Sequence, residues 1–294
     1  MAKIQVRNFP DDVYARITQA AAENERSIEG EVRYALMQAY PDRQPAPLSQ
    51  RDRWQLETAG RLQQLIAQLD ADGFWPHRSR GGVVALAGMI GEATPAYLMD
   101  CMDGTAALSY DVAMRLADAT ACGARWLLEQ HGDQFPVEDI GSHYHNYFWP
   151  DAPGDYHFHL FRLGTQPGMK SLFCIRHNRT DNTYAMGQVM GQFYLGDGMG
   201  ATGMGNLKRF LQYLKKHGTQ LRRTAYLFDA DAASSDTGNH HPCYYLNGTL
   251  HTESDWLDSM LNGGTPDWLS EFSFYADEVR QTPYGDNDSD GTTR

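Results

Sequence analysis

Histidines in the second half of the chain have a spacing that could hold a metal ion. His143 and His145 form one His-x-His pair, and His157 and His159 form another. Residues i and i+2 of a strand point to the same side, so each pair could offer two imidazoles to one ion. Further candidates are His177, His240, His241 and Cys243. No carboxylate or cysteine is spaced to complete a site, and histidine also suits stacking in an aromatic-rich sheet, so no metal is predicted.

A glycine-rich stretch, GDGMGATGMG at residues 196–205, could approach a phosphate group. Gly198, Gly200 and Gly203 have the GxGxxG spacing, in which backbone amides face a pyrophosphate at a helix N-terminus. The next acid after a strand, Asp229, lies farther away than the ~20 residues typical of that motif. A glycine-rich turn or loop is therefore the favoured interpretation, and no cofactor is predicted.

A cationic stretch follows the glycines. Residues 206–223 contain six Lys and Arg residues and no acid. The segment NLKRFLQYLKKHG predicts a helix with one apolar side, and Lys208, Arg209, Lys215 and Lys216 cover the other side. Such a face could rest on a phosphate backbone or could simply be solvated, and both interpretations stay open.

The first residues carry a different kind of chemistry. In KIQVR, residues 3–7, polar and apolar side chains alternate, so Lys3, Gln5 and Arg7 share one face of a strand. Lys and Arg can pair with guanine and Gln with adenine, so these residue types can read base edges. A lone strand is unstable and must pair with another strand.

Two helices must position this strand. Pro10, Asp11 and Asp12 predict the start of the first helix, and Ser27 is a suitable N-cap for the second, which Pro41 ends. A strand and two helices of this size cannot bury their own apolar faces. We therefore expect a twofold homodimer, or a higher homo-oligomer, in which two strands pair as a ribbon.

The stretch KIQVRNFPDDVYARITQAAAENERSIEGEVRYAL resembles the Arc-type ribbon-helix-helix DNA-binding fold, in particular its FitA-like antitoxin branch. The resemblance covers about the first 43 residues. It implies that the paired strands enter the major groove and that Lys3, Gln5 and Arg7 contact base edges. It also implies that Ser27, the first amides of the second helix and Arg26 bind a phosphate.

Residues 83–130 resemble the helix-turn-helix of phage-repressor and HigA-type antitoxin proteins. In this resemblance residues 85–90 form the first helix, Gly91 forms the turn, Thr94 caps the recognition helix and Gly104 ends it.

The chemistry of that second helix does not suit DNA. It offers Tyr97, Asp100 and Asp103 and no cation, and carboxylates oppose binding to a polyanion. Two roles stay open for this segment: weak DNA contact, through the loop residues His77, Arg78 and Arg80, or packing and dimerisation.

Composition limits the remaining possibilities. The formal net charge is −12, so any nucleic-acid contact must rest on a local patch. The four cysteines form no CxxC pair, which favours a reducing cytoplasm. No apolar run approaches the ~20 residues of a membrane span, so no membrane partner is expected.

The sequence therefore predicts a multidomain α+β chain that binds double-stranded DNA as a transcriptional regulator. The expected parts are a ribbon-helix-helix domain (1–43), a linker (44–50), a helical domain (51–135), an α+β sensor or oligomerisation domain (136–280) and a disordered acidic tail (281–294). A repressor of antitoxin or plasmid/prophage type, without enzyme activity, is the favoured function, and a toxin partner stays open. The alternative is a nucleotide- or metal-binding enzyme or sensor domain in residues 136–280 that the ribbon targets to DNA.

Overall fold

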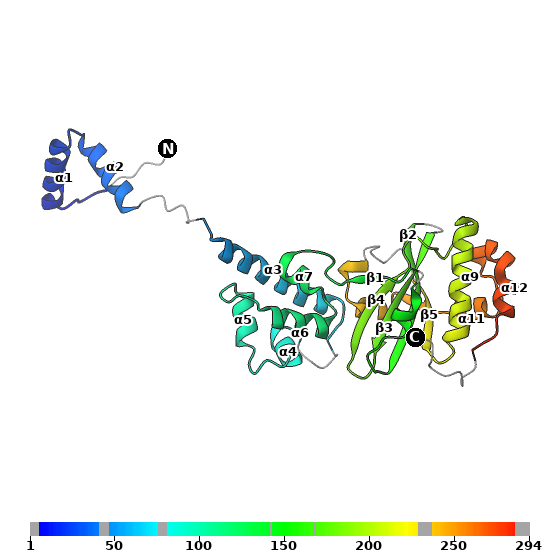
Figure 1. Cartoon of the computed structure of the whole chain (residues 1–294). Helices are drawn as coiled ribbons and strands as arrows, with labels where there is room; N and C mark the ends of the chain where they lie inside the picture. Colours follow the sequence, from blue (N-terminus) through cyan, green and yellow to red (C-terminus); the bar gives the residue numbers. More distant parts are fainter. Residues whose placement is uncertain are drawn as a thin grey trace. The chain divides into compact units, whose positions relative to one another are not determined.

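A computed structural model of the chain describes residues 6–40, 47–75, 81–141, 143–166, 169–228 and 237–285. The chain forms two compact units, residues 1–50 and residues 51–294 (Figure 1). The described residues combine helices with one six-stranded sheet, so the expected α+β class is confirmed.

The first unit contains two helices, α1 (Asp11–Glu23) and α2 (Ile28–Ala39). Pro10 precedes α1, and its carbonyl accepts the first helical hydrogen bond. Ser27 precedes α2, and its Oγ accepts a hydrogen bond from the amide of Gly30 at 3.0 Å. A serine in this position satisfies an amide that the helix leaves without a partner, so both predicted helix starts are confirmed.

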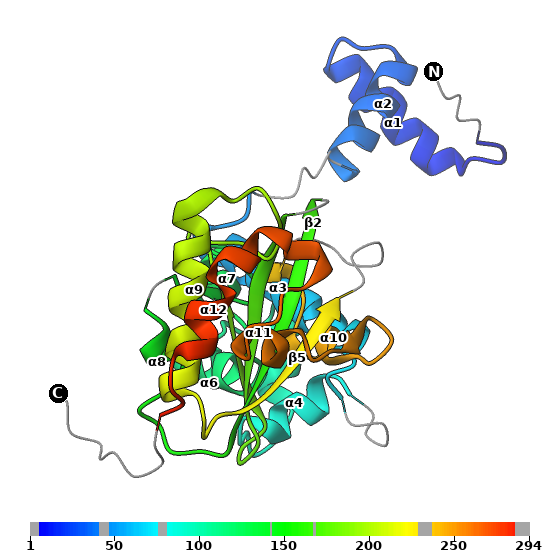
Figure 2. The same ribbon diagram turned by 90° about the vertical axis from the view of Figure 1, so that its right-hand side faces the viewer.

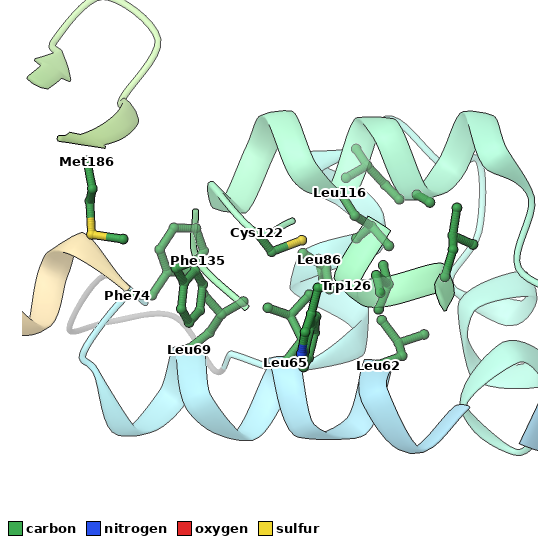
Figure 3. Packing of buried hydrophobic residues seen from close by; sticks show 14 of the residues in the cluster. Leu62, Leu65, Leu69, Phe74, Leu86, Leu116, Cys122, Trp126, Phe135 and Met186 are labelled. Carbon is green, nitrogen blue, oxygen red and sulfur yellow. The ribbon is translucent and has the colours of Figure 1, made fainter. Parts of the chain in front are cut away.

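The second unit begins with a group of helices. Leu62, Leu65 and Leu69 recur at helical spacing on the first of them and are fully buried (Figure 3). The helices are α3 (Gln50–Ala71), α4 (Val83–Met89), α5 (Ala96–Met102), α6 (Tyr110–Thr120) and α7 (Ala124–Glu129).

A mixed six-stranded sheet follows, in the order β1-β4-β3-β2-β5-β6. The pairs β1·β4 and β2·β5 are parallel, and the other neighbours are antiparallel. The strands are β1 (Val137–Asp139), β2 (Tyr156–Gln166), β3 (Met169–Asn178), β4 (Thr183–Gln188), β5 (Arg222–Phe228) and β6 (His251–Glu253).

Helices also flank this sheet. Figure 2 shows α9, α11 and α12 over one face of it. The segments are α8 (Tyr144–Phe148), α9 (Gly200–His217), α10 (Pro242–Leu246), α11 (Trp256–Leu261) and α12 (Ser273–Gln281), with 3₁₀ turns at Thr237–Asn239 and Asp267–Phe272.

The two faces of the sheet are buried in two different cores. Phe158 and Leu160 of β2 pack with α9, α11 and α12, whereas Phe161 and Leu163 pack with residues of α3 to α7. This is the alternation that a strand covered on both sides requires. The aromatic-rich segments DYHFHLFRL (155–163) and SLFCIRHN (171–178) predict strands, and β2 and β3 confirm both.

The expected boundary between residues 135 and 136 lies inside the second unit. Phe135 is fully buried, and it belongs to the same core as Leu69 and Phe74 of the helical part and Met186 of β4 (Figure 3). The helices α3 to α7 and one face of the sheet therefore share one hydrophobic core.

Three predicted segments differ from the structure. The aromatic segment CYYLNGTL at residues 243–250 predicts a strand, but Pro242 stands at the first position of α10 and His241 caps it, which favours a helix. The segment TYAMGQVMGQFYL predicts a strand over residues 183–195, but β4 ends at Gln188. The predicted disordered tail is wrong for residues 281–285, since Thr282 is buried and Tyr284 donates a hydrogen bond to Asn262. Residues 286–294 lie outside the described part.

Candidate nucleic-acid interface

The predicted base-reading strand lies only partly within the described residues. Lys3 and Gln5 are outside them, and Arg7 is exposed just before α1. Asn8 has a φ of 60°, and Pro10 then leads into α1. The chain therefore turns between Arg7 and the helix, and residues 6–10 form no strand pairing within the described part of the chain.

The predicted phosphate-binding residues lie together in the turn between α1 and α2. Ser27 caps α2, and Arg26 is the residue before it. The Nη1 of Arg26 donates to Oε2 of Glu31 at 3.3 Å, and its Cζ lies 4.0 Å from the centre of the Tyr34 ring. The side chain of Arg26 stays 38% exposed, so its remaining N–H groups can reach a ligand.

The first unit has almost no core of its own. Among its described residues, only Ala21 and Glu31 are buried. Large apolar side chains are exposed instead: Val6, Phe9, Tyr14, Tyr34, Leu36, Met37 and Tyr40. A unit of this kind needs a further surface to cover its apolar side chains.

The helix-turn-helix-like segment departs from the expected geometry at its second helix. Gly91 has a φ of 75°, as a turn requires, but Pro95 and not Thr94 is the N-cap of α5, so the Thr94 prediction is wrong. The carbonyl of Pro95 accepts the first hydrogen bond of α5, from the amide of Met99 at 3.0 Å, which places the helix start one residue after Thr94. Gly104, with a φ of 70°, follows the helix end as predicted.

The side chains of α5 do not form a DNA-reading face. The hydroxyl of Tyr97 donates to the carbonyl of Ala107 at 2.7 Å and accepts from the amide of Ser109 at 2.9 Å. Tyr97 therefore holds the following loop, and the exposed acids are Asp100 and Asp103. The loop residues His77, Arg78 and Arg80 lie outside the described residues.

The cations of α9 are not a continuous exposed face. Lys208 forms an ion pair with Glu278 of α12 at 2.7 Å, and Arg209 donates to Asn206. Lys215 is only 3% exposed, so its predicted place on the exposed side is wrong. Lys216 is exposed.

The position of Lys215 has a physical reason. Lys215 follows the buried Leu211 by four residues, which puts both on the apolar side of α9. Its Nζ donates to the carbonyls of Val279 and Arg280 at 3.1 and 2.9 Å. The last carbonyls of a helix lack partners within it, and Lys215 supplies donors for α12.

The glycine-rich stretch does not fit a dinucleotide. Gly198 and Gly200 have positive φ, as a turn requires, but Gly203 lies inside α9 against Met199. The amide of Gly198 donates to the carboxylate of Glu271 at 3.1 Å. Glu271 therefore occupies the amide that a pyrophosphate would need as a donor. Its negative charge also opposes an anionic ligand at this place.

His157, His159 and His177 lie in a row on the sheet, with their rings in contact distance of one another. The rings of His157 and His159 lie 4.1 Å apart, and His159 Nδ1 lies 3.1 Å from the hydroxyl of Tyr226. Burial, reinforced by neighbouring histidines, lowers the pKa of His159 to about 3. Within the described ranges no group of three or more His, Cys, Asp or Glu residues is placed to hold a metal ion.

One polar cluster was not indicated by the sequence. Asp72, at the end of α3, is buried, and its carboxylate accepts from His240 Nδ1 at 2.9 Å and from the amide of His241. Gln68 also donates to Asp72. The cluster ties the helical part of the second unit to the segment before α10.

Comparison with known proteins gives one match. Residues 2–40 match the family model described as antitoxin FitA-like, ribbon-helix-helix, which confirms the resemblance of the N-terminal segment. No curated protein and no solved structure matches the chain. No helix among the described residues has the length and apolarity needed to cross a membrane.

Proposed function

We propose that the chain is a sequence-specific DNA-binding transcriptional regulator of antitoxin type that represses transcription by occupying an operator. The match of residues 2–40 to a ribbon-helix-helix antitoxin family carries this proposal. The helix α1, the capped α2 and the turn between them support it, because they supply the two helices that such a domain needs.

Specificity would come from the strand before α1. Two copies of residues 3–9 pair as an antiparallel ribbon in the major groove, and Lys3, Gln5 and Arg7 contact base edges. Arg26 and the α2 N-terminus, capped by Ser27, bind a backbone phosphate and fix the ribbon in the groove.

The exposed apolar residues of the first unit support a homodimer. In the described part of the unit, Ala21 is the one hydrophobic residue that a single copy buries. The free energy gained by burying one alanine cannot offset the entropy lost in ordering two helices. A second copy would cover these residues and would also supply the missing partner strand. Its twofold axis predicts a palindromic operator.

The second unit would set oligomer geometry or bind a ligand or partner protein, including a toxin. The buried Lys215, the Lys208–Glu278 pair and the exposed acids of α5 leave it poorly suited to DNA. Base reading then depends on the first unit.

The decisive experiment selects duplexes from a random-sequence pool with the full-length chain and measures affinity for the enriched sequence. We expect a palindrome, and we expect Arg7→Ala and Lys3→Ala each to weaken binding by about 1–3 kcal/mol. Arg125→Ala is a matched control, since Arg125 is an exposed cation of α7 paired with Glu129. Unchanged affinity in both ribbon variants would refute the ribbon as the reader.

Repression and assembly need separate measurements. Light scattering of the free chain should give a dimer or a larger oligomer. Transcription from a promoter that contains the enriched sequence should fall when the chain is added, and Arg7→Ala should restore it. If adding the chain does not change transcription, repression is refuted, even if the chain binds the DNA.

A further inference from the structure

We propose that Glu31 is a positioning residue that holds the guanidinium of Arg26 beside the N-terminus of α2, where the phosphate contact forms. The inference rests on the proposed DNA-binding function and identifies what sets its backbone contact. Glu31 itself touches no DNA in this proposal.

The burial of Glu31 is the first observation. It is one of only two buried residues in the described part of the first unit, although glutamate is almost never buried unless it is paired. Its carboxylate accepts from Asn24 Nδ2 at 3.2 Å and from Arg26 Nη1 at 3.3 Å. Glu31 therefore connects α2 to the end of α1 and to the turn residue that precedes the cap.

The environment of Arg26 is the second observation. Its guanidinium lies between the carboxylate of Glu31 and the ring of Tyr34, whose centre is 4.0 Å from Cζ. An arginine has five N–H donors, and Glu31 takes one of them. The other donors can bind a phosphate while the side chain remains fixed, which reduces the entropy lost on binding.

The backbone of the turn between α1 and α2 also holds Arg26 in place. Glu25 has a φ of 52°, and the amide of Arg26 donates to the carbonyl of Ala21 at 2.8 Å, so the Cα of Arg26 has a defined position. A Cβ at Gly30 would lie 3.2 Å from Ser27 Oγ and 3.8 Å from Arg26 Cβ. The contact with Ser27 Oγ would be tight, so the glycine leaves room for the cap.

The sign of the effect distinguishes positioning from simple charge. A carboxylate near a phosphate weakens DNA binding, so neutralising it should strengthen binding. Glu29, two residues earlier, is exposed and pairs with Arg33 at 2.6 Å. If Glu31 positions Arg26, then Glu31→Gln weakens binding, whereas the matched control Glu29→Gln leaves it unchanged or stronger.

The experiment measures the affinity of the full-length chain for the palindromic duplex enriched by the selection above, by fluorescence anisotropy over a range of salt concentrations. We expect Arg26→Ala and Glu31→Ala each to weaken binding about tenfold and to reduce the salt slope by about one for each protomer, or about two for the dimer. The double variant should bind as Arg26→Ala does, because Glu31 acts only through Arg26. Glu31→Gln, which keeps the size and one acceptor, should show an intermediate loss.

Three results would overturn the proposal. In the first, both Glu31 variants bind as tightly as the wild type. In the second, the losses of Arg26→Ala and Glu31→Ala add in the double variant. In the third, Glu31→Gln strengthens binding as Glu29→Gln does.

Two other causes of weak binding, a failure of the variant to assemble and a failure of the proposed function, can be separated from a failure of this inference. If light scattering shows that Glu31→Ala no longer assembles, the DNA affinity of the conservative variant Glu31→Gln tests the positioning role instead. If the wild type binds no duplex at all, both the proposed function and this inference are refuted. If the wild type binds and the Glu31 variants bind equally well, only this inference is refuted.

Discussion

Acid should destabilise the second unit, because two of its imidazoles are buried in their neutral form. His241 is fully buried, and its Nδ1 accepts a hydrogen bond from the amide of Cys243 at 3.1 Å, so the proton is on Nε2. His159 is 8% exposed beside Tyr226. Burial lowers the pKa of each imidazole to about 3.

The size of the effect follows from proton linkage. An unfolded histidine has a pKa of about 6.5, so between that value and about 3 the unfolded chain binds protons that the folded chain does not bind. Stability is therefore nearly full at pH 7.5 and falls as the pH drops through 6.5. From pH 7.5 to pH 5 the loss is about 2 kcal/mol for each imidazole, or about 4 kcal/mol for the two. Domains are typically stable by only about 5–15 kcal/mol, so this loss is large.

Urea unfolding at the two pH values tests this prediction. All six tryptophans lie between residues 54 and 268, so their fluorescence reports the second unit alone. We expect His241→Asn, whose amide oxygen can still cap α10, to reduce the pH-dependent loss by about 2 kcal/mol. The matched control His131→Asn replaces an exposed imidazole and should leave the loss unchanged. A wild-type pH dependence in His241→Asn would refute the reasoning.

Three further predictions concern single side chains. Lys215→Met should lower the free energy of unfolding by about 1–3 kcal/mol in urea titration, because two carbonyls of α12 lose their donor, while Lys216→Met should change it by less than about 0.5 kcal/mol. Tyr97→Phe should cost about 1–2 kcal/mol in the same assay and leave DNA affinity unchanged, and a loss of affinity would instead place α5 on the DNA. Ser27→Ala should lower the stability of the first unit by about 1 kcal/mol in thermal melts followed by circular dichroism, whereas Ser27→Thr should retain most of it.

The sequence predicted those features that depend on neighbouring residues. Ser27 was identifiable as a cap because serine is a preferred residue at that position, before an apolar stripe of helical spacing. Lys215 was misplaced although its signal was present, since it lies four residues after Leu211 on the same side of α9. Pro242 likewise marks a helix start, although the aromatic residues that follow it are typical of a strand.

Other features could not be predicted from local patterns. Asp72 and His240 are 168 positions apart, and only the shared core of the helices and the sheet brings them together. The pairing order of the sheet has the same origin, because β1 and β6 are three-residue edge strands with little sequence signal. Glu31 looked like an ordinary residue of the first turn of α2, and its burial depends on how the turn folds back over it.

The charges of the first unit favour specific over general DNA binding. Two of its exposed arginines, Arg16 and Arg33, are paired with acids four residues earlier, Asp12 and Glu29. These pairs add little stability, but each one offsets a charge that could attract phosphates at a distance. With a net charge of −12, the whole chain would also be repelled from arbitrary DNA. Under the proposed function, affinity then has to come from contacts at the ribbon and at the α2 N-terminus, which form only when the protein is aligned with its operator. The fixed position of Arg26 would therefore affect the ratio of specific to non-specific binding.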